Sequence, residues 1–127
     1  MRECVLDSSV LLAILKGEPL DPSVYELIAG GIMSAVNLVE VYSRISDLGL
    51  TLTPKTDALL ALLDRIEPFT EQQARVAGKL RAATRHAGLS LGDGACLALA
   101  LELGAEVYSA DRAWAGLHVG CPIHLVR

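Results

Sequence analysis

The feature that most constrains the fold is an alternation between short apolar runs and longer segments with helical character. Strand-like runs are expected at residues 3–6, 32–35, 66–69, 105–110 and 122–126. Strands that alternate with helices pair in parallel through right-handed crossovers. The sequence therefore predicts an α/β fold: a three-layer α/β/α sandwich around a short, mainly parallel sheet of four or five strands.

Helices are expected between these strands, at residues 8–17, 23–31, 37–48, 54–65, from 70 onward and 90–104. Pro54, directly after Thr53, is a typical helix start, and Gly104 is a typical helix end. Helical spacing predicts two buried faces, one formed by Leu38, Val41, Ile45 and Leu48 and the other by Val76, Leu80, Ala83 and Ala87.

The length and composition favour a folded, soluble chain. Its 127 residues suit one domain, expected over residues 1–127, and an apolar content of 52% argues against disorder. The longest apolar run, residues 95–101, is too short to span a bilayer, and the first residues lack a secretory signal. Cys4, Cys96 and Cys121 show no zinc or disulfide spacing, so we expect reduced thiols. We expect a cytoplasmic protein without a membrane segment.

Four acidic residues stand where carboxylates can converge. Asp7 and Asp111 directly follow strands, and such sheets bind ligands beyond the carboxyl ends of their strands. Asp93 lies between two glycines at the start of an apolar helix. Glu40 points away from the apolar face of its own helix.

Each acid also has a purely structural interpretation. Asp7 and Asp111 can cap the helices that follow them. Asp93 can complete a capping box with the residue three positions earlier, Ser90. Glu40 can form an ion pair with Arg44, four residues further along the same helix.

Taken together, the four acids favour a metal site. Clustered carboxylates need raised pKa values or a cation between them. Hard oxygen ligands suit Mg²⁺ or Mn²⁺, which can activate water and stabilise a phosphoryl transition state. The net charge of −4 argues against simple electrostatic binding of nucleic acid, but a cation would let such an acidic chain act on phosphodiesters.

Three segments, followed by a closing strand, resemble those of PIN-domain nucleases, and most closely VapC-like toxins of bacterial toxin–antitoxin pairs. They are VLDSSVLLAILKGE (5–18), SAVNLVEVYSR (34–44) and LSLGDGACLALALELGAEVYSADRAWA (89–115). The resemblance extends over about residues 3–126. It implies an endoribonuclease that depends on Mg²⁺ or Mn²⁺, is often a homodimer, and is held inactive by a cognate antitoxin.

The resemblance also implies roles for individual residues. Four positions match the catalytic and metal-binding acids of the family: Asp7, Glu40, Asp93 and Asp111. Ser9 matches a position where Ser or Thr lies near the metal, and Ser109 is expected to support Asp111. One departure is Gly94, where many relatives have Arg. This puts the substrate contacts at that position in doubt, while the four acids remain intact.

Basic and apolar residues suggest where RNA and partners bind. Arg112 is expected to contact phosphate because a guanidinium offers two parallel donors; a solvated surface arginine is the alternative. The basic residues of the helix from 70 either contact phosphate or flank a packed face. The LLALL segment, residues 59–63, is either core or a dimer or antitoxin surface.

Two other functions remain open. An aspartyl-phosphate phosphatase usually has a second Asp two residues after the first, where this chain has Ser9. A catalytically weak PIN module could instead bind RNA or protein while cleaving little, and a metal titration separates it from a nuclease. The sequence contains no dinucleotide-binding or acyl-transfer motif.

Overall fold

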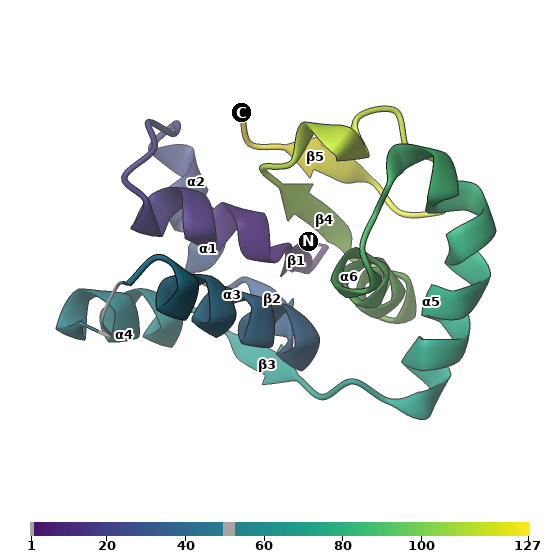
Figure 1. The fold of residues 1–127 in the computed structure, drawn as a ribbon, viewed down its shortest axis with the longest axis horizontal. Helices are drawn as coiled ribbons and strands as arrows, with labels where there is room; N and C mark the ends of the chain where they lie inside the picture. Colours follow the sequence, from purple (N-terminus) through teal and green to yellow (C-terminus); the bar gives the residue numbers. More distant parts are fainter. Residues whose placement is uncertain (1, 50–52) are drawn as a thin grey trace.

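A computed structural model, which describes residues 2–49 and 53–127, contains a five-stranded parallel sheet (Figure 1). The strand order is β3-β2-β1-β4-β5. The strands are β1 (Cys4–Leu6), β2 (Ile32–Ser34), β3 (Arg65–Glu67), β4 (Glu106–Ser109) and β5 (Ile123–Leu125). The predicted α/β/α sandwich is therefore confirmed, with five strands that are all parallel.

Helices connect the strands and cover both faces of the sheet (Figure 1). The α-helices are α1 (Ser8–Leu15), α2 (Ser23–Ile28), α3 (Ala35–Asp47), α4 (Pro54–Ala61), α5 (Glu71–Thr84) and α6 (Leu91–Leu103). Two short 3₁₀ helices, η1 (Arg85–Ala87) and η2 (Arg112–Trp114), follow α5 and β4. Within residues 2–49 and 53–127, no helix is both long enough and apolar enough to cross a bilayer.

The sheet separates two apolar cores because successive strand residues face opposite sides. Leu6 and Met33 pack with the core-facing residues of α1 to α4. On the other face, Val5 and Ile32 pack against α6, which is buried from Ala95 to Ala100. Helix α5 lies outside α6, so this half of the molecule is two helices deep (Figure 1).

The order of the strands creates a topological switch point beside β1. The chain proceeds outward from β1 to β2 and β3, and then returns to add β4 and β5 on the other side. Val5 pairs with both Ile32 of β2 and Val107 of β4, so β1 is central. Parallel sheets of this kind bind ligands beyond the carboxyl ends of the strands at such a point.

Side-chain caps explain where the helices begin. Thr53, Thr70 and Ser90 each accept a hydrogen bond from the backbone N–H three residues further on, at the starts of α4, α5 and α6. Ser34 caps α3 through the N–H of Val36, so α3 begins two residues before the predicted position. Gly104 ends α6 in the left-handed conformation, with φ of 63°, as the sequence predicts.

Three helix predictions were wrong in detail. Helix α4 ends at Ala61 rather than near residue 65, because the Leu62 carbonyl accepts from Gly30 and the Asp64 N–H bonds to Gly31 as the chain enters β3. Ala83 is exposed, and the neighbouring Thr84 takes its place on the buried side of α5. Leu48, which was predicted to belong to the buried face of α3, is 43% exposed. It lies just beyond the end of the helix at Asp47.

Candidate functional site

Asp7 is the most deeply buried of the four acids, with 2% of its surface exposed. Its backbone N–H donates to the Tyr108 carbonyl at 3.0 Å and so extends the pairing of β1 with β4. Its carboxylate does not cap α1, so that interpretation was wrong. Oδ2 accepts from Ser9 Oγ at 2.6 Å and from Ser109 Oγ at 3.1 Å. Oδ1 is buried and has no partner among the described residues.

The two serines tie the ends of β1 and β4 together. Their hydroxyl oxygens lie 3.3 Å apart. Ser9 Oγ also accepts from the Ala110 N–H at 2.9 Å, and Ser109 Oγ accepts from the Asp111 N–H at 3.0 Å. This small network places Asp7 and Asp111 at the same edge of the sheet.

Asp111 is exposed and caps the short helix η2, as its structural interpretation predicts. Its Oδ1 accepts from the Ala113 N–H at 2.9 Å. The cap leaves Asp111 close enough to Asp93 for the two charges to interact, since Asp111 helps to raise the pKa of Asp93.

Glu40 faces the sheet edge and α6 rather than Arg44. In the described part of the chain no ion pair joins Glu40 to Arg44, so that prediction was wrong. Glu40 Oε1 instead accepts from Asn37 Nδ2 at 2.7 Å and from Ser8 Oγ at 3.3 Å. A Cβ added at Gly92 would lie 2.5 Å from Oε2, so only glycine lets this carboxylate lie against α6.

Asn37 is a site residue that the sequence reasoning missed. It is fully buried, and its Nδ2 donates both to Glu40 and to the Gly92 carbonyl at 3.0 Å. The sequence spacing of Asn37 and Glu40 could have indicated their contact, because residues three apart on a helix are neighbours. Its contact with α6, in contrast, depends on the fold.

Asp93 completes the capping box that the sequence predicts. Its Oδ2 accepts from the Ser90 N–H at 2.9 Å, and its own N–H donates to Ser90 Oγ at 3.2 Å. The side chain is half-buried at the entrance of α6. Its carboxylate therefore engages the helix terminus and also lies within electrostatic range of two other acids.

Electrostatic interactions link the four carboxylates in pairs: Asp7 with Asp93 and Glu40, and Asp93 with Asp111. Burial raises the pKa of Asp7 to about 6, and the charges of Asp93 and Glu40 add to this effect, while the serine hydrogen bonds oppose it. Burial likewise raises the pKa of Asp93, with a smaller contribution from Asp111. Concentrated negative charge of this kind favours either bound protons or a bound cation.

The donor set suits a hard divalent cation, because every candidate ligand is a carboxylate oxygen. The buried Oδ1 of Asp7, without a partner among the described residues, is the atom best placed to take one. As the side chains stand, no three acidic, histidine or cysteine groups in the described ranges gather closely enough to hold an ion. Asp93, Asp111 and Glu40 each bond to protein groups, so they would bind after a side-chain shift or through water.

Two arginines lie beside the acids. Ser9, Asp111, Arg112 and Arg127 line an open recess of about 670 Å³. Arg127 donates from Nε to the Ala110 carbonyl at 2.9 Å and forms an ion pair with Glu18. Arg112 is exposed at this recess, and its phosphate contact stays a prediction. Arg127 was missed, because only the pairing of β5 with β4 brings it to this edge.

Comparison with known proteins gives one family and one fold. The family model described as the PIN domain matches residues 4–118. No curated protein sequence matches the chain.

Several solved structures share the fold at low sequence identity. A toxin–antitoxin complex from Klebsiella pneumoniae superposes with a TM-score of 0.70 at 16% identity, covering 96% of each chain. DNA-bound VapBC from Salmonella typhimurium gives 0.70 at 18% identity, with all of both chains covered. VapC20 of Mycobacterium tuberculosis, described as a Sarcin-Ricin loop cleaving toxin, gives 0.63 at 18% identity, covering 94% of this chain and 100% of that one.

Proposed function

This chain belongs to the PIN-domain family, and from that premise we propose that it is a metal-dependent endoribonuclease that hydrolyses RNA phosphodiester bonds. The observation that carries the proposal is the environment of Asp7. Its carboxylate is buried at the switch point, held through Oδ2 by two serines, and its Oδ1 lacks a partner within the described residues. The charges of Asp93 and Glu40 help to raise its pKa, and Asp111 in turn acts on Asp93.

In the proposed mechanism each residue has a defined task. Asp7, Asp93 and Asp111 would hold Mg²⁺ or Mn²⁺, with Glu40 as a further ligand, directly or through water. When bound, such a cation would supply charge stabilisation at the phosphate and would activate water for hydrolysis. Ser9 and Ser109 fix the orientation of the Asp7 carboxylate. Arg112 contacts a phosphate of the substrate.

We extend the proposal to a toxin of a toxin–antitoxin pair, acting in the cytoplasm as a homodimer with a cognate antitoxin. The support is the likeness to the Klebsiella complex, to VapBC and to VapC20. A second observation is a groove of about 630 Å³ lined by residues of α1 to α4, including the exposed Tyr25 and Leu62. Exposed apolar surface of this kind often marks a protein interface. Co-purification from the native host, followed by identification of the bound small protein, tests the antitoxin.

The experiment that tests the nuclease uses the purified protein, RNA and either Mg²⁺ or EDTA. Cleavage is expected with Mg²⁺ and not with EDTA, and it is expected to be lost in Asp7→Asn and Asp93→Asn. Asp47→Asn, an exposed acid at the end of α3, is the matched control and should cleave as the parent does. Unchanged cleavage by Asp7→Asn and Asp93→Asn would refute the assignment of these carboxylates as catalytic.

A catalytically weak PIN module is the second candidate, and one observation favours it. Asp93, Asp111 and Glu40 already satisfy hydrogen bonds within the protein, so a cation must compete with these bonds. Titration with Mn²⁺ separates the two functions. A nuclease should bind the ion and lose that binding in Asp7→Asn, whereas a pure binding module should bind RNA with no need for Mn²⁺.

A further inference from the structure

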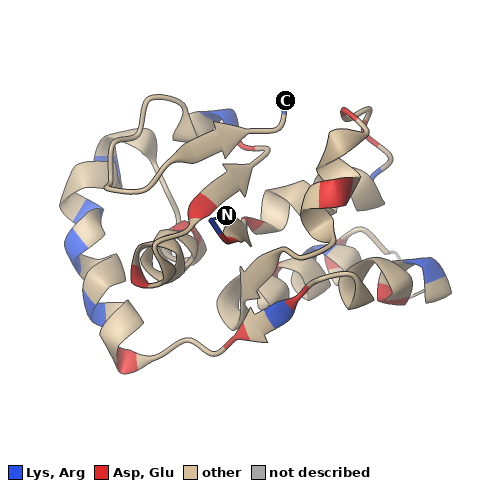
Figure 2. Ribbon diagram, turned by 180° about the vertical axis from the view of Figure 1, so that it is seen from behind, with Lys and Arg blue, Asp and Glu red and all other residues tan. Residues whose placement is uncertain are grey.

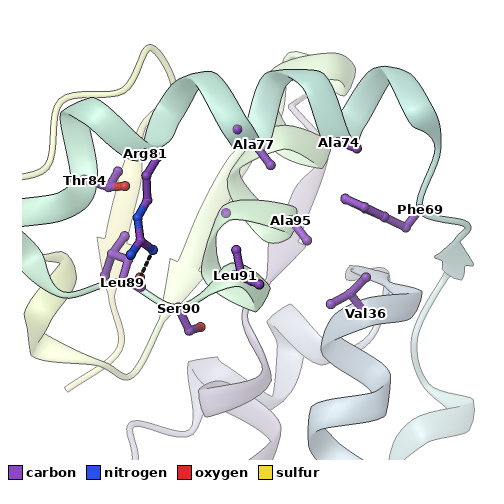
Figure 3. Close-up of a pocket in the computed structure, with 12 residues that line it drawn as sticks. Val36, Phe69, Ala74, Ala77, Arg81, Thr84, Leu89, Ser90, Leu91 and Ala95 are labelled. Carbon is purple, nitrogen blue, oxygen red and sulfur yellow. Dashed lines mark hydrogen bonds between the residues drawn. The ribbon is translucent and has the colours of Figure 1, made fainter.

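An apolar groove lies between α5 and the start of α6 (Figure 3). Its volume is about 320 Å³. Ala74, Ala77 and Gly78 form one wall, and Gly94 and Ala95 form the other. In Figure 3, Phe69 and Val36 close one end, while Arg81 and Leu89 close the other. The groove is thus a defined slot between two helices.

The slot exists because small residues face each other. A Cβ at Gly94 would make only ordinary contact with Ala77 Cβ, at 3.6 Å, and a Cβ at Gly78 would meet nothing within 4 Å in the described structure. Packed interiors normally fill such space with side chains. The rim is also apolar and open, since Phe69 is 40% and Leu91 85% exposed. An exposed apolar surface of this kind marks an interaction site, and the charge around it decides between a protein and another ligand.

The slot adjoins the proposed catalytic acids. Ser90 lines it and shares both capping-box hydrogen bonds with Asp93. Gly94, in the wall of the slot, directly follows Asp93. A group in the slot would therefore lie next to Asp93, one of the proposed metal ligands.

The charge around the slot favours a polyanion over an apolar peptide. Lys and Arg residues follow one another along α5 (Figure 2). Lys79, Arg81 and Arg85 form no ion pair with any described residue, whereas Arg75 pairs with Glu71. Positive charge that tracks a backbone, beside a surface that accepts flat groups, is how proteins hold single-stranded nucleic acid.

The slot also has the volume for one planar ring system, with groups that can stack on it at its two ends, Phe69 and Arg81 (Figure 3). Its volume is at the lower end of the range typical of small-ligand pockets, about 300–1,000 Å³, and too small for a helix about 10 Å across. At one end of the slot, the Arg81 guanidinium is held in place by a 3.3 Å hydrogen bond that it donates to the Leu89 carbonyl. An aromatic ring and a guanidinium plane are the two groups on which unpaired bases stack.

We propose that this slot holds one unpaired nucleobase of the RNA beside the scissile phosphate, an inference that rests on the proposed nuclease function. The walls offer little beyond the Ser90 hydroxyl and Arg81 to hydrogen-bond a base edge. Stacking is therefore the main interaction, and removing the base weakens binding more than exchanging it for another base.

The test compares variants of the slot with matched controls. Gly94→Leu fills the slot, and Phe69→Ala removes its stacking surface. Gly94→Ala adds only a methyl group, and Tyr42→Ala removes an aromatic of similar exposure from α3. Binding is measured by fluorescence anisotropy with a labelled single-stranded RNA and with an abasic strand of equal length, both with Ca²⁺ as the cation. Thermal unfolding establishes that each variant is folded.

The parent is expected to bind the abasic strand roughly fivefold or more weakly than the RNA. Gly94→Leu and Phe69→Ala should lose that difference, and both controls should keep it. Equal RNA affinity in all variants would overturn the proposal and point to a protein as the occupant of the slot. No binding of single-stranded RNA by the parent, or no preference over the abasic strand, would also overturn it.

Cleavage of the abasic strand with Mn²⁺ keeps this inference separate from the proposed function, since that strand has phosphodiester bonds but no base to enter the slot. Gly94→Leu should hydrolyse the abasic strand as the parent does and cleave RNA more slowly. A parent that hydrolyses neither substrate, yet binds RNA through the slot, would refute the nuclease and uphold the base site. RNA cleavage at equal rates in every slot variant would uphold the nuclease and refute the base site.

Discussion

The hydroxyl of Ser109, at the end of β4, donates a 3.1 Å hydrogen bond to Oδ2 of Asp7, at the end of β1. The same hydroxyl accepts from the Asp111 N–H. One side chain thus orients two of the proposed metal ligands across the switch point. Loss of a group that holds a metal ligand in place typically lowers the metal affinity of a site by about 10- to 100-fold.

Ser109→Ala should therefore weaken Mn²⁺ binding by about tenfold or more. Its free energy of unfolding should fall by about 1–3 kcal/mol, because the Asp111 N–H loses its acceptor. Calorimetric titration and urea unfolding measure the two effects. Ser46→Ala, on the exposed side of α3, is the control. Unaltered Mn²⁺ affinity in Ser109→Ala would show that the serine has no part in the site.

Asp7 should make the metal-free protein less stable as the pH rises. Its pKa is raised from 3.8 to about 6 by burial, so the folded state binds a proton that the unfolded state releases at lower pH. The free energy of unfolding should therefore decline between about pH 4 and pH 6, by about 3 kcal/mol in total. Urea unfolding in EDTA across this range measures the decline.

Asp7→Asn removes that ionisation and should flatten the pH dependence. At pH 7.5 in EDTA the variant should be more stable than the parent by about 1–3 kcal/mol. Saturating Mn²⁺ should reverse the order, because a ligand of the folded state stabilises only the protein that binds it. A parent that gains no stability from Mn²⁺ would contradict the metal site.

The parts of this structure that local chemistry determines could be predicted from the sequence. The capping box of Ser90 with Asp93 and the cap by Asp111 depend on residues two or three apart, so their spacing was sufficient. The positions of Asp7 and Asp111 at one edge followed from the rule that parallel strands end on the same side of a sheet.

The parts that depend on contacts between distant segments could not be predicted. Spacing favoured Arg44 as the partner of Glu40, but the Glu40 carboxylate bonds instead to Asn37 on the same helix and lies against α6, where Gly92 makes room for it. The bond from Asn37 to the Gly92 carbonyl spans 55 residues, and no local pattern records it. Arg127 reaches Ala110 only because β5 adds beside β4.

Gly92 and Gly94 should respond oppositely to alanine. In Gly92→Ala the new Cβ displaces the Glu40 carboxylate, which it would approach to 2.5 Å, so RNA cleavage and Mn²⁺ binding should both fall. The flexible Glu40 side chain can move away, so the free energy of unfolding should change by less than about 1 kcal/mol. Cleavage assays, calorimetry and urea unfolding give the three values.

Gly94→Ala should instead stabilise the protein by about 0.5–1 kcal/mol and leave Mn²⁺ binding unchanged. Its Cβ makes ordinary contact with Ala77, and alanine favours the helix over glycine. The two glycines thus serve as controls for each other. Similar effects of both substitutions on Mn²⁺ binding would contradict a specific role for the close approach of Glu40 to Gly92.

Arg112 should contribute to RNA affinity through charge and not through stability. It is exposed in η2 beside Asp111 and lines the recess at the edge of the sheet. Arg112→Gln should weaken RNA binding about equally for different sequences and lower the slope of log affinity against log salt by roughly one. Anisotropy titrations at several salt concentrations measure the slope, and urea unfolding should match the parent. Arg44→Gln, on the exposed side of α3, is the control. An unchanged salt slope in Arg112→Gln would mean that this guanidinium does not contact phosphate, and the contact would then pass to its neighbour in the recess, Arg127.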